Sequence, residues 1–579
     1  MSPIQIAKRF STYLKSFKKE LLTMLIVGMI GGGSAIGLTA LTGKIVNLIG
    51  QPSTAFSRTL LLSIIIFIFG IIIATLAQWY VQRLSFNITA QVIDALRQKT
   101  IRHLNQFSIQ TFDSFETGDV VSRLTNDLDN VSTAIQQLLV AVFSSFITVC
   151  IALVVMVSLS WSLTLVILCT TPFIFLLTYI VARRGQHYFQ EQQTIVGQLT
   201  AFAEEYVHEQ ALVQLYQQQA QVEQQFQRMN QSLYTVGQRA QFISSLTNPL
   251  SRFVDHITYA LIGLVGGWMI YRSSGSVAVG LLSSFTLYAS QFSKPFIELS
   301  GILTQIQTAL VGLKRVFTIL DIPADTCSLP QHQWKHPQGK IDFEDVTFGY
   351  QPTQPVIQHF NLHVQPGERV AIVGKTGAGK STLINLLLRF YEVQSGMIYL
   401  DNQPITSIDK SSLRANFGLV LQETWFFNSS ILDNLRLGAP QASRQEVIQA
   451  AKKANAHSFI QRLPHGYDTV LDEQTNLSEG ERQLLSIART LLSNPKILVL
   501  DEATSSLDTL TEKRVQEAFE HLMKNRTSFV IAHRLTTIKQ SDQILMVENG
   551  QIMERGTHEQ LIRNKNSHYA IMYRDQFKK

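Results

Sequence analysis

Six long apolar segments in the first half of the chain constrain its fold more than any other feature. A helix needs roughly 20 mostly apolar residues to cross the hydrocarbon of a membrane. We therefore predict six membrane-spanning helices, at residues 21–46, 60–80, 138–159, 163–181, 250–271 and 277–299. Buried helices of a soluble protein are the alternative, but the first four segments are too long and too nearly free of charge for that interpretation.

Lysines and arginines beside these segments indicate their orientation. They gather before the first predicted helix, between the second and third, and between the fourth and fifth, whereas the other connecting loops are short and nearly uncharged. Because basic loops stay on the cytoplasmic side, we expect both chain ends in the cytoplasm of a multi-pass protein of the cell membrane. The basic residues behind the net charge of +7 do not form a single patch, because many lie beside the apolar segments. We therefore expect no nucleic-acid partner. The basic residues before the first helix are Lys8, Arg9, Lys15, Lys18 and Lys19.

Two of the predicted spans contain ionisable residues. Arg252, Asp255 and His256 lie near the start of the fifth span, and Lys294 and Glu298 lie in the sixth. Ionisable groups inside a membrane are costly and often functional, so Asp255 and Glu298 are candidates for contacting cationic amphiphiles. The stronger alternative is simple pairing, of Lys294 with Glu298 one helical turn away and of Asp255 with Arg252.

The two long cytoplasmic connections, residues 80–136 and 182–248, are predicted to be helical. Their apolar residues recur at helical spacing and they contain few glycines, so the helices should run far beyond the membrane. Residues 112–119 interrupt the first extension with a turn. A turn at the far end of such an extension is what contact with another domain requires.

The sequence pattern changes at about residue 321. Residues 321–339 form a polar, proline-containing linker, and from residue 340 to 579 short β-branched strands alternate with helices. That alternation is typical of an α/β domain. We therefore predict a membrane domain at residues 1–320, a linker at 321–339 and an α/β domain at 340–579.

Residues 374–381, Gly-Lys-Thr-Gly-Ala-Gly-Lys-Ser, form a pattern that binds phosphate groups. An apolar run at 370–373 predicts a strand before it, and residues 382–388 predict a helix after it. Glycines let a backbone wrap closely around phosphate oxygens, and the helix N-terminus adds partial positive charge. In this pattern Lys380 reaches the β- and γ-phosphates and the Ser381 hydroxyl binds Mg²⁺. A chance glycine-rich turn would not have all these parts in register, so we predict that the chain binds a nucleoside triphosphate.

A second apolar strand, residues 496–500, leads to Asp501 and Glu502. Open α/β sheets place their ligands at the carboxyl ends of strands. Asp501 is suited to hold Mg²⁺ through water, and Glu502 to polarise the attacking water as a general base. Acidic pairs also cap helices, but the phosphate loop upstream favours the catalytic interpretation. The predicted fold class is thus an α-helical membrane domain of six long helices with cytoplasmic extensions, followed by an α/β phosphate-loop ATPase domain.

These features, with several shorter motifs, resemble the ABC transporter superfamily, in particular exporter half-transporters with six spans fused to one nucleotide-binding domain. The resemblance covers essentially the whole chain. Residues 477–483, Leu-Ser-Glu-Gly-Glu-Arg-Gln, resemble the signature motif of the family. Gln422 matches the Q-loop and Asp508 the D-loop. His533 matches the switch histidine, and Tyr350 the aromatic residue that stacks on adenine.

The resemblance implies a role for each of these residues. Glu502, His533 and Gln422 would be catalytic, and Ser381, Gln422 and Asp501 would hold Mg²⁺. Taken singly, Tyr350, Gln422 and His533 carry little signal, but their order behind both phosphate motifs favours the functional interpretation. The residues implied to bind ATP are Tyr350, Gly374, Thr376, Gly377, Gly379, Lys380, Ser381, Thr382, Asp501, Ser478, Gly480 and Asp508.

The resemblance also implies a partner. In the family two nucleotide-binding domains close on ATP, with the phosphate loop of one chain facing the signature of the other, and contacts near residues 112–119 and 204–216 pass this closure to the membrane helices. Glu209 stands where the family often has glycine. Glu479 and Glu481 stand where the usual signature has Gly and Gln, although Ser478 and Gly480 are retained. Since an added carboxylate near phosphate is unfavourable, we expect a second ABC half-transporter as partner, with a heterodimer favoured over a homodimer.

The implied function is ATP-driven export of small amphiphilic or hydrophobic compounds, of the multidrug type, by alternating access in a lipid membrane. The open alternative is a lipid flippase, or a peptide or lipopeptide exporter, of the same architecture. A soluble ABC-type ATPase acting on DNA or ribosomes is excluded by the predicted spans.

Overall fold

The computed structural model describes residues 2–49, 56–272, 279–325, 332–335, 337–351, 353–421, 424–472, 475, 477–501, 509–532, 535–564 and 566–577. The chain divides into two compact units. The helical unit comprises Met1–Gln106 and Phe115–Pro323, and the α/β unit comprises Phe107–Ser114 and Ala324–Lys579.

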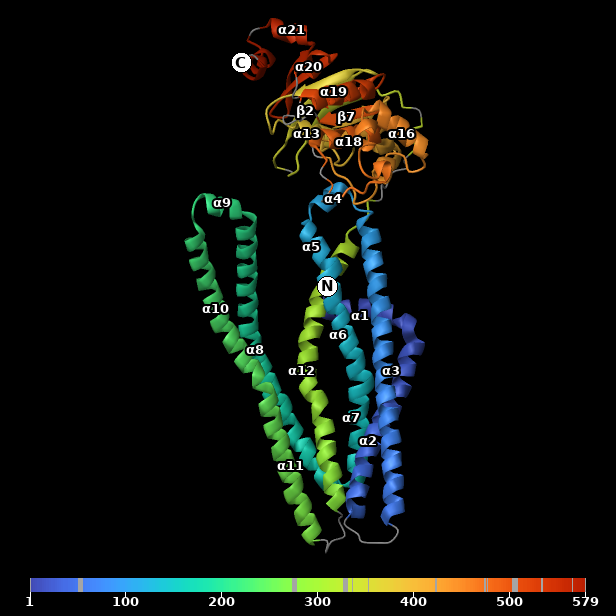
Figure 1. Cartoon of the computed structure of the whole chain (residues 1–579), viewed down its shortest axis with the longest axis vertical. Coiled ribbons are helices and arrows are strands. Elements are labelled where there is room, and N and C mark those ends of the chain that lie inside the picture. The colour runs from blue at the N-terminus through green and yellow to red at the C-terminus, as the bar shows by residue number, and fades with distance from the viewer. Residues whose placement is uncertain are drawn as a thin grey trace. The chain divides into compact units, whose positions relative to one another are not determined.

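The helical unit consists of long helices (Figure 1). Its longest elements are α2 (Lys18–Ile49), α3 (Phe56–Leu104), α8 (Trp161–His208), α10 (Gln219–Ser245), α11 (Thr247–Arg272) and α12 (Val279–Asp321). A further rod is continuous from α5 (Thr117–Ser122) through α6 (Leu128–Val140) to α7 (Ile147–Leu159), with π-helical turns at Arg123–Asp127 and Ala141–Phe146. The shorter elements are α1 (Pro3–Leu14), a 3-10 turn at Lys15–Phe17 and α9 (Gln210–Leu215).

Five helical stretches among the described residues are long and apolar enough to cross a membrane. They contain the first five predicted spans, and the sixth predicted span continues into α12 from Val279. The five stretches are Pro3–Ile49, Arg58–Leu104, Thr117–Leu159, Trp161–His208 and Gln219–Arg272. The predicted fold class is confirmed, including the extensions: the 49 residues of α3 span about 70 Å at 1.5 Å per residue, against about 30 Å of hydrocarbon.

The apolar surface of this unit faces outward as well as inward. Only 6% of the most apolar part of α3 is buried, and side chains such as Ile65 and Phe69 are more than half exposed. Soluble proteins rarely expose apolar patches of this kind, so lipid is the natural solvent of this face. Inside the unit, one buried cluster joins α1, α2, α3, α6 and α12, and a second joins α2, α7, α8, α11 and α12.

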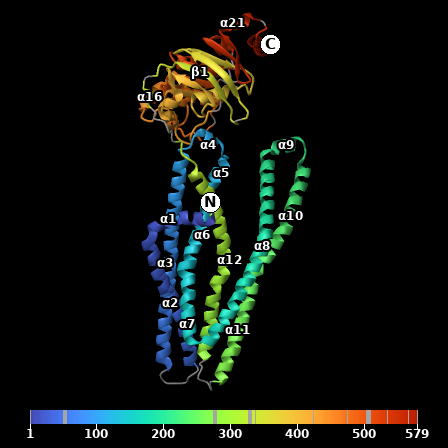
Figure 2. The same ribbon diagram turned by 180° about the vertical axis from the view of Figure 1, so that it is seen from behind.

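The cytoplasmic extensions differ in detail from the predicted pattern. The predicted turn at 112–119 is a short helix, α4 (Ile109–Asp113), followed by a break and then by α5. In the second extension, α8 and α10 run side by side and α9 lies at their tip (Figures 1 and 2). Glu209, between α8 and α9, has φ −97° and ψ 20°, a conformation that does not need glycine.

The α/β unit is built on two sheets. A four-stranded antiparallel sheet has the order β2-β1-β4-β5, and a six-stranded sheet has the order β10-β9-β3-β8-β7-β6. In the second sheet β9, β3, β8, β7 and β6 are parallel and β10 is an antiparallel edge strand. The strands are β1 (Ile341–Phe348), β2 (Ile357–Val364), β3 (Arg369–Val373), β4 (Ser395–Leu400), β5 (Gln403–Pro404), β6 (Phe417–Val420), β7 (Ile497–Asp501), β8 (Thr527–Ile531), β9 (Gln543–Glu548) and β10 (Gln551–Gly556).

Helices cover both sheets and complete the hydrophobic cores of this unit. Residue Trp334, within the predicted linker, is 5% exposed in one of these cores, and its Nε1 donates to Asp401 at 3.1 Å. The helices are α4, α13 (Lys380–Leu387), α14 (Lys410–Ala415), α15 (Ile431–Arg436), α16 (Arg444–Lys453), α17 (His457–Ile460), α18 (Glu479–Ser493), α19 (Thr509–Met523), α20 (Leu535–Lys539), α21 (His558–Arg563) and α22 (His568–Phe577).

Candidate functional site

The predicted phosphate loop joins β3 to α13 in the α/β unit. Three of its glycines have positive φ, Gly374 at 156°, Gly377 at 84° and Gly379 at 99°, and Gly379 caps α13 in the left-handed conformation. Gly374 has no room for a side chain, because a Cβ there would lie 2.2 Å from the Val547 carbonyl oxygen. Only glycine meets both requirements without strain, so the sequence pattern corresponds to a tightly curved backbone at the start of α13.

Lys380 lies across the mouth of this loop. Its Nζ donates to the carbonyl oxygens of Gly374, at 2.7 Å, and Lys375, at 3.0 Å. Burial lowers the pKa of Lys380, and the nearby Asp501 carboxylate opposes that shift. An ammonium held at the loop, partly withdrawn from water, is suited to a polyanionic ligand.

Asp501 ends β7, which lies between β8 and β6 in the parallel part of the sheet. In the order β3-β8-β7-β6, the carboxyl ends of all four strands lie at one edge, which is where open α/β sheets place ligands. The chain leaving β6, β7 and β8 leads to Gln422, Glu502 and His533 respectively. Gln422, Glu502, Asp508 and His533 themselves lie outside the described residues, so their predicted roles stay predictions.

Tyr350 is attached to the helix that follows the phosphate loop. Its hydroxyl lies 3.3 Å from Thr382 Oγ1 and accepts from Asn385 Nδ2 at 3.2 Å. Tyr350 as a whole is 48% exposed. The structure thus brings together Tyr350, Thr382, Lys380 and the loop glycines, and it places Ser381 in an exposed position on the first turn of α13.

A second tyrosine, Tyr391, connects this ring to α4. The rings of Tyr350 and Tyr391 meet edge to face, with centroids 5.1 Å apart. The Tyr391 hydroxyl donates to Asp113 Oδ2 of α4 at 2.5 Å. Burial, with the Asp113 carboxylate beside it, raises the pKa of Tyr391 to about 12, so the hydroxyl stays protonated as a donor. No pattern in the sequence predicts this contact, because the two residues are 278 positions apart.

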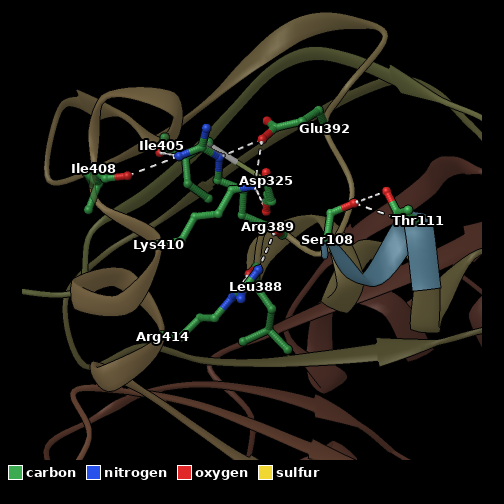
Figure 3. A network of polar contacts seen from close by, with 10 residues as sticks. All are labelled: Ser108, Thr111, Asp325, Leu388, Arg389, Glu392, Ile405, Ile408, Lys410 and Arg414. Carbon is green, nitrogen blue, oxygen red and sulfur yellow. Dashed lines mark hydrogen bonds and ion pairs between the residues drawn. The ribbon is translucent and has the colours of Figure 1, made fainter. Parts of the chain in front are cut away.

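A polar network ties the start of the α/β unit to its core (Figure 3). Lys410 Nζ donates to both Asp325 carboxylate oxygens, at 2.9 and 2.7 Å. The buried Arg389 donates to Glu392 at 2.8 Å and to the carbonyl oxygens of Ile405 and Ile408. Asp325 is thus held only four residues after α12 ends.

The predicted signature lies at the start of α18. Ser478 is the N-cap, and its hydroxyl accepts from the Glu481 backbone N–H at 3.3 Å. In return, Glu481 Oε2 accepts from the backbone N–H and the hydroxyl of Ser478, both at 3.0 Å. Gly480 is buried while Ser478 is exposed. This is a capping box, whose Ser-x-x-Glu pattern is visible in the sequence and could have been read there.

The ionisable residues of the predicted spans are only partly described. Asp255 on α11 has a buried carboxylate oxygen, Oδ1, without a hydrogen-bond partner among the described residues. The expected pairing of Asp255 with Arg252 is not found in that part of the chain. The side chain of Glu298 lies outside the described residues, so its pairing with Lys294 stays a prediction.

Comparison with known proteins agrees with this architecture. The family model of the ABC transporter transmembrane region matches residues 21–296, and the ABC transporter model, for the ATPase domain, matches residues 357–505. A solved structure titled as a bacterial Atm1-family ABC exporter with ATP bound is similar to this chain, with a TM-score of 0.80 and 27% identity over 97% of this chain and 100% of the other.

Curated relatives cover most of the chain. A Mycobacterium bovis protein named fatty acid ABC transporter ATP-binding/permease protein is 38% identical, over 90% of this chain and 82% of its own. An ATP-dependent lipid A-core flippase of Syntrophus aciditrophicus is 36% identical, over 83% and 80%. A Bacillus subtilis protein named a probable multidrug resistance ABC transporter, YheH, is 32% identical, over 85% and 73%.

These matches span both units and both phosphate motifs. The chain therefore belongs to the ABC transporter family, as an exporter that couples ATP hydrolysis in a cytoplasmic domain to transport through a multi-pass helical membrane domain.

Proposed function

We propose that this chain is one half of a heterodimeric exporter of small amphiphilic or hydrophobic compounds in the cell membrane. ABC exporters act as dimers, so the open questions are which second half completes the pair, how the two ATP sites differ, and what is carried. The observation that carries the heterodimer is the bond between Glu481 and the Ser478 hydroxyl in the signature.

The phosphate loop of this chain fits a hydrolytic site. The curved loop and Lys380 suit the phosphates, and the oxygens of Ser381 and Asp501 are the ligand type that Mg²⁺ prefers. When bound, Mg²⁺ neutralises charge on the phosphates. In this proposal Gln422 completes the metal site, Glu502 polarises the attacking water, and His533 donates to the γ-phosphate.

Around the rest of the nucleotide, the proposed contacts come from both chains. Tyr350 stacks on adenine, and Asp508 lies at the interface between the two ATPase domains. The remaining proposed ATP contacts of the phosphate loop and α13 are Gly374, Thr376, Gly377, Gly379 and Thr382.

The signature of this chain fits a weaker site in the partner. In the closed pair Ser478 and Gly480 face the γ-phosphate held by the other chain. Here the Glu481 carboxylate accepts a hydrogen bond from the Ser478 hydroxyl at 3.0 Å. Glu479 adds a second exposed carboxylate. Negative charge beside a triphosphate is unfavourable. The strong site therefore combines this chain's phosphate loop with a partner signature that lacks these carboxylates.

The exposed tip of the second extension supports a contact with the partner. In the helical unit, Val207, Leu212, Leu215 and Tyr216 are each about half exposed or more, up to 72% at Leu215. An apolar tip of this kind indicates a protein contact. In the proposed dimer this tip docks on the partner's ATPase domain, so that closure of the two domains moves α8 and α10.

The substrate class rests on the lipid-facing character of the helices and on the relatives. Proteins named for a fatty acid, for lipid A-core and for multidrug resistance all match along most of the chain, and a fatty acid and lipid A are both amphiphilic. Export of lipids, favoured by the first two names, is the second candidate. Asp255 Oδ1, which has no hydrogen-bond partner among the described residues, gives cationic amphiphiles a preferred contact.

The test is substrate-stimulated ATPase activity in proteoliposomes that contain both halves. We expect amphiphilic dyes or lipids to stimulate ATP hydrolysis, and the compounds that stimulate it more strongly identify the substrate class. Glu502→Gln should reduce hydrolysis by roughly 10²–10⁴-fold while ATP still binds, whereas Lys380→Ala should weaken ATP binding itself. Near-normal turnover in Glu502→Gln would show that the base assignment is wrong.

The same assay addresses the membrane carboxylate. Asp255→Asn should lower transport of cationic dyes while transport of neutral ones is retained. If Asp255→Asn transported cationic dyes as well as the wild type does, Asp255 would be excluded from the substrate path.

A further inference from the structure

The N-terminal helix α1 differs from the other helices of its unit in its direction. It lies crosswise to the long helices in both views (Figures 1 and 2). Its inner side is apolar: Ile6 and Phe10 are 2% and 7% exposed and belong to the same buried cluster as Phe317 of α12. Its outer side carries Ile4, 80% exposed, and the exposed Lys8.

The outer side of α1 continues into a strongly basic segment. Lys8, Lys15, Lys18 and Lys19 are all exposed. Glu20 is the only acidic residue in the chain before Asp94. Among the described residues the ion pairs found for this segment involve Arg9 alone, so the four lysine ammonium groups are available for an outside partner.

The sequence of α2 places these lysines at the edge of the membrane. Directly after Lys19 an exposed apolar face begins, with Leu22 at 58%, Ile26 at 48% and Ile30 at 51% exposure. Since a helix rises 1.5 Å per residue, Lys19 and Leu22 are about 4.5 Å apart along the axis. If Leu22 and Ile26 face hydrocarbon, the lysines stand at the level of the lipid headgroups.

Two contacts connect α1 to the end of α12. Arg9 donates to Asp321 at 2.6 Å, and its guanidinium lies 4.4 Å from the centre of the Phe317 ring. Asp321 is the last residue of α12. On the other side, Lys99 of α3 donates to the Tyr13 hydroxyl at 3.3 Å.

We propose that α1 and the segment after it form a binding surface for anionic phospholipid headgroups, and that this binding holds the cytoplasmic end of α12 through Arg9. Clusters of basic residues beside a membrane helix attract anionic lipids, and the exposed Ile4 adds an apolar anchor. This surface is separate from the ATP site and from the substrate path, so it would act whatever compound is carried.

Hydrogen exchange of the full-length chain, paired with its partner half, tests this directly. The protein is placed in nanodiscs of phosphatidylcholine with or without phosphatidylglycerol. We expect the amides of α1 to exchange more slowly when phosphatidylglycerol is present, because each lysine contributes roughly fivefold to lipid affinity. Glycerol phosphate added to phosphatidylcholine discs should have no such effect. Slower exchange with soluble glycerol phosphate, or no response to phosphatidylglycerol in the wild type, would overturn the proposal.

Matched variants locate the effect. The response should disappear when Lys8, Lys15, Lys18 and Lys19 are all changed to Gln, and it should persist when all four are changed to Arg. The control removes the same charge from the α/β unit by changing four exposed lysines to Gln, namely Lys452, Lys453, Lys513 and Lys524. Equal loss in this control would show that net charge, and not α1, is responsible. The wild-type comparison stands even where a multiple variant folds poorly.

The connection to α12 has its own measurement. In the wild type, phosphatidylglycerol should also slow exchange in the last turn of α12. Asp321→Asn should abolish that second effect while the response of α1 remains. Slowed exchange at the end of α12 in Asp321→Asn would show that Arg9 does not transmit the restraint.

Discussion

In the proposed ATP site, single residues around the phosphate loop have different roles. Lys380 supplies charge, the glycines supply a curved backbone, and Tyr350 supplies a flat ring whose hydroxyl is fixed by Thr382 and Asn385. The hydroxyl and the ring face have separate roles in this arrangement. In the proposed site the hydroxyl positions the residue, and the ring face stacks on the base.

This division predicts different outcomes at Tyr350. Tyr350→Ala removes the ring, and since stacking on a base is worth about 1–3 kcal/mol, the apparent KM for ATP should rise roughly tenfold. Tyr350→Phe keeps the ring and loses only the bonds to α13, so its KM should rise by less than about threefold. ATP titrations of ATPase activity measure both. An unchanged KM in Tyr350→Ala would exclude stacking.

At the scale of elements, a charged cluster joins the first extension to α12. Arg315 of α12 contacts Asp119 and, at 2.8 Å, Asp127, while Arg123 contacts Asp119 at 2.5 Å. Arg123 also donates to the Arg315 carbonyl oxygen at 3.2 Å. The π-helical turn Arg123–Asp127 lies within this cluster. The charged cluster therefore holds α12, near its end, against the segment that follows α4.

Removing the central cation should loosen this junction. Arg315→Gln removes the cation beside Asp127 and leaves Asp119 paired with Arg123 alone. For a partly exposed cluster we expect a loss of about 1–3 kcal/mol in unfolding free energy. The neighbouring, exposed Lys314 provides the control Lys314→Gln, which should be neutral. Thermal unfolding in detergent compares the two. Equal melting temperatures for both variants would contradict a structural role of the cluster.

Two capping boxes of the same design allow the signature to be tested as an element. Ser478 caps α18 and Ser443 caps α16, each with a glutamate three residues on. Ser478→Ala and Ser443→Ala should each cost about 1 kcal/mol of stability. Only Ser478→Ala should also weaken ATP binding at the weak site of the assembled pair, because only Ser478 faces nucleotide in the proposed dimer. Equal ATP binding by the two variants would remove Ser478 from the ATP site.

How far the sequence determined these elements depends on whether the signal is local. The spans, β3, β7 and the phosphate loop follow from apolar runs and from glycine spacing, which act within one element. The capping box at Ser478 was equally local. The bond between Asp113 and Tyr391, by contrast, joins segments 278 residues apart and depends on how α4 packs. No local pattern specifies such a contact.

Other parts of the site were predictable only as a set. Gln422, Asp508 and His533 were assigned by their order along the chain and by family resemblance, whereas Glu502 was assigned from the apolar strand before it and the phosphate loop upstream. All four lie outside the described residues. What the fold adds is the parallel order β3-β8-β7-β6, which places the strand ends that precede Gln422, Glu502 and His533 at one edge of one sheet. The π-helical turns and the ordinary backbone at Glu209 had no signal in the sequence.

At the scale of the whole molecule, we propose that this chain supplies the hydrolytic phosphate loop of a heterodimer. One chain has one set of spans and one ATPase domain, whereas the site proposed above needs a signature from a second chain. In the proposal, the carboxylates of Glu479 and Glu481 make this chain a poor donor of that signature to a copy of itself. A partner with an uncharged signature would complete the strong site.

The most direct measurement is to purify the chain expressed alone and the chain expressed with its partner half, and to compare their ATPase activity and transport in proteoliposomes at equal amounts of this chain. We expect the chain alone to show little ATPase activity and no stimulation by amphiphiles, and the pair to show both activity and transport. Glu502→Gln in the pair should abolish most of that activity. A stable two-fold homodimer with full substrate-stimulated ATPase activity and transport would contradict the heterodimer.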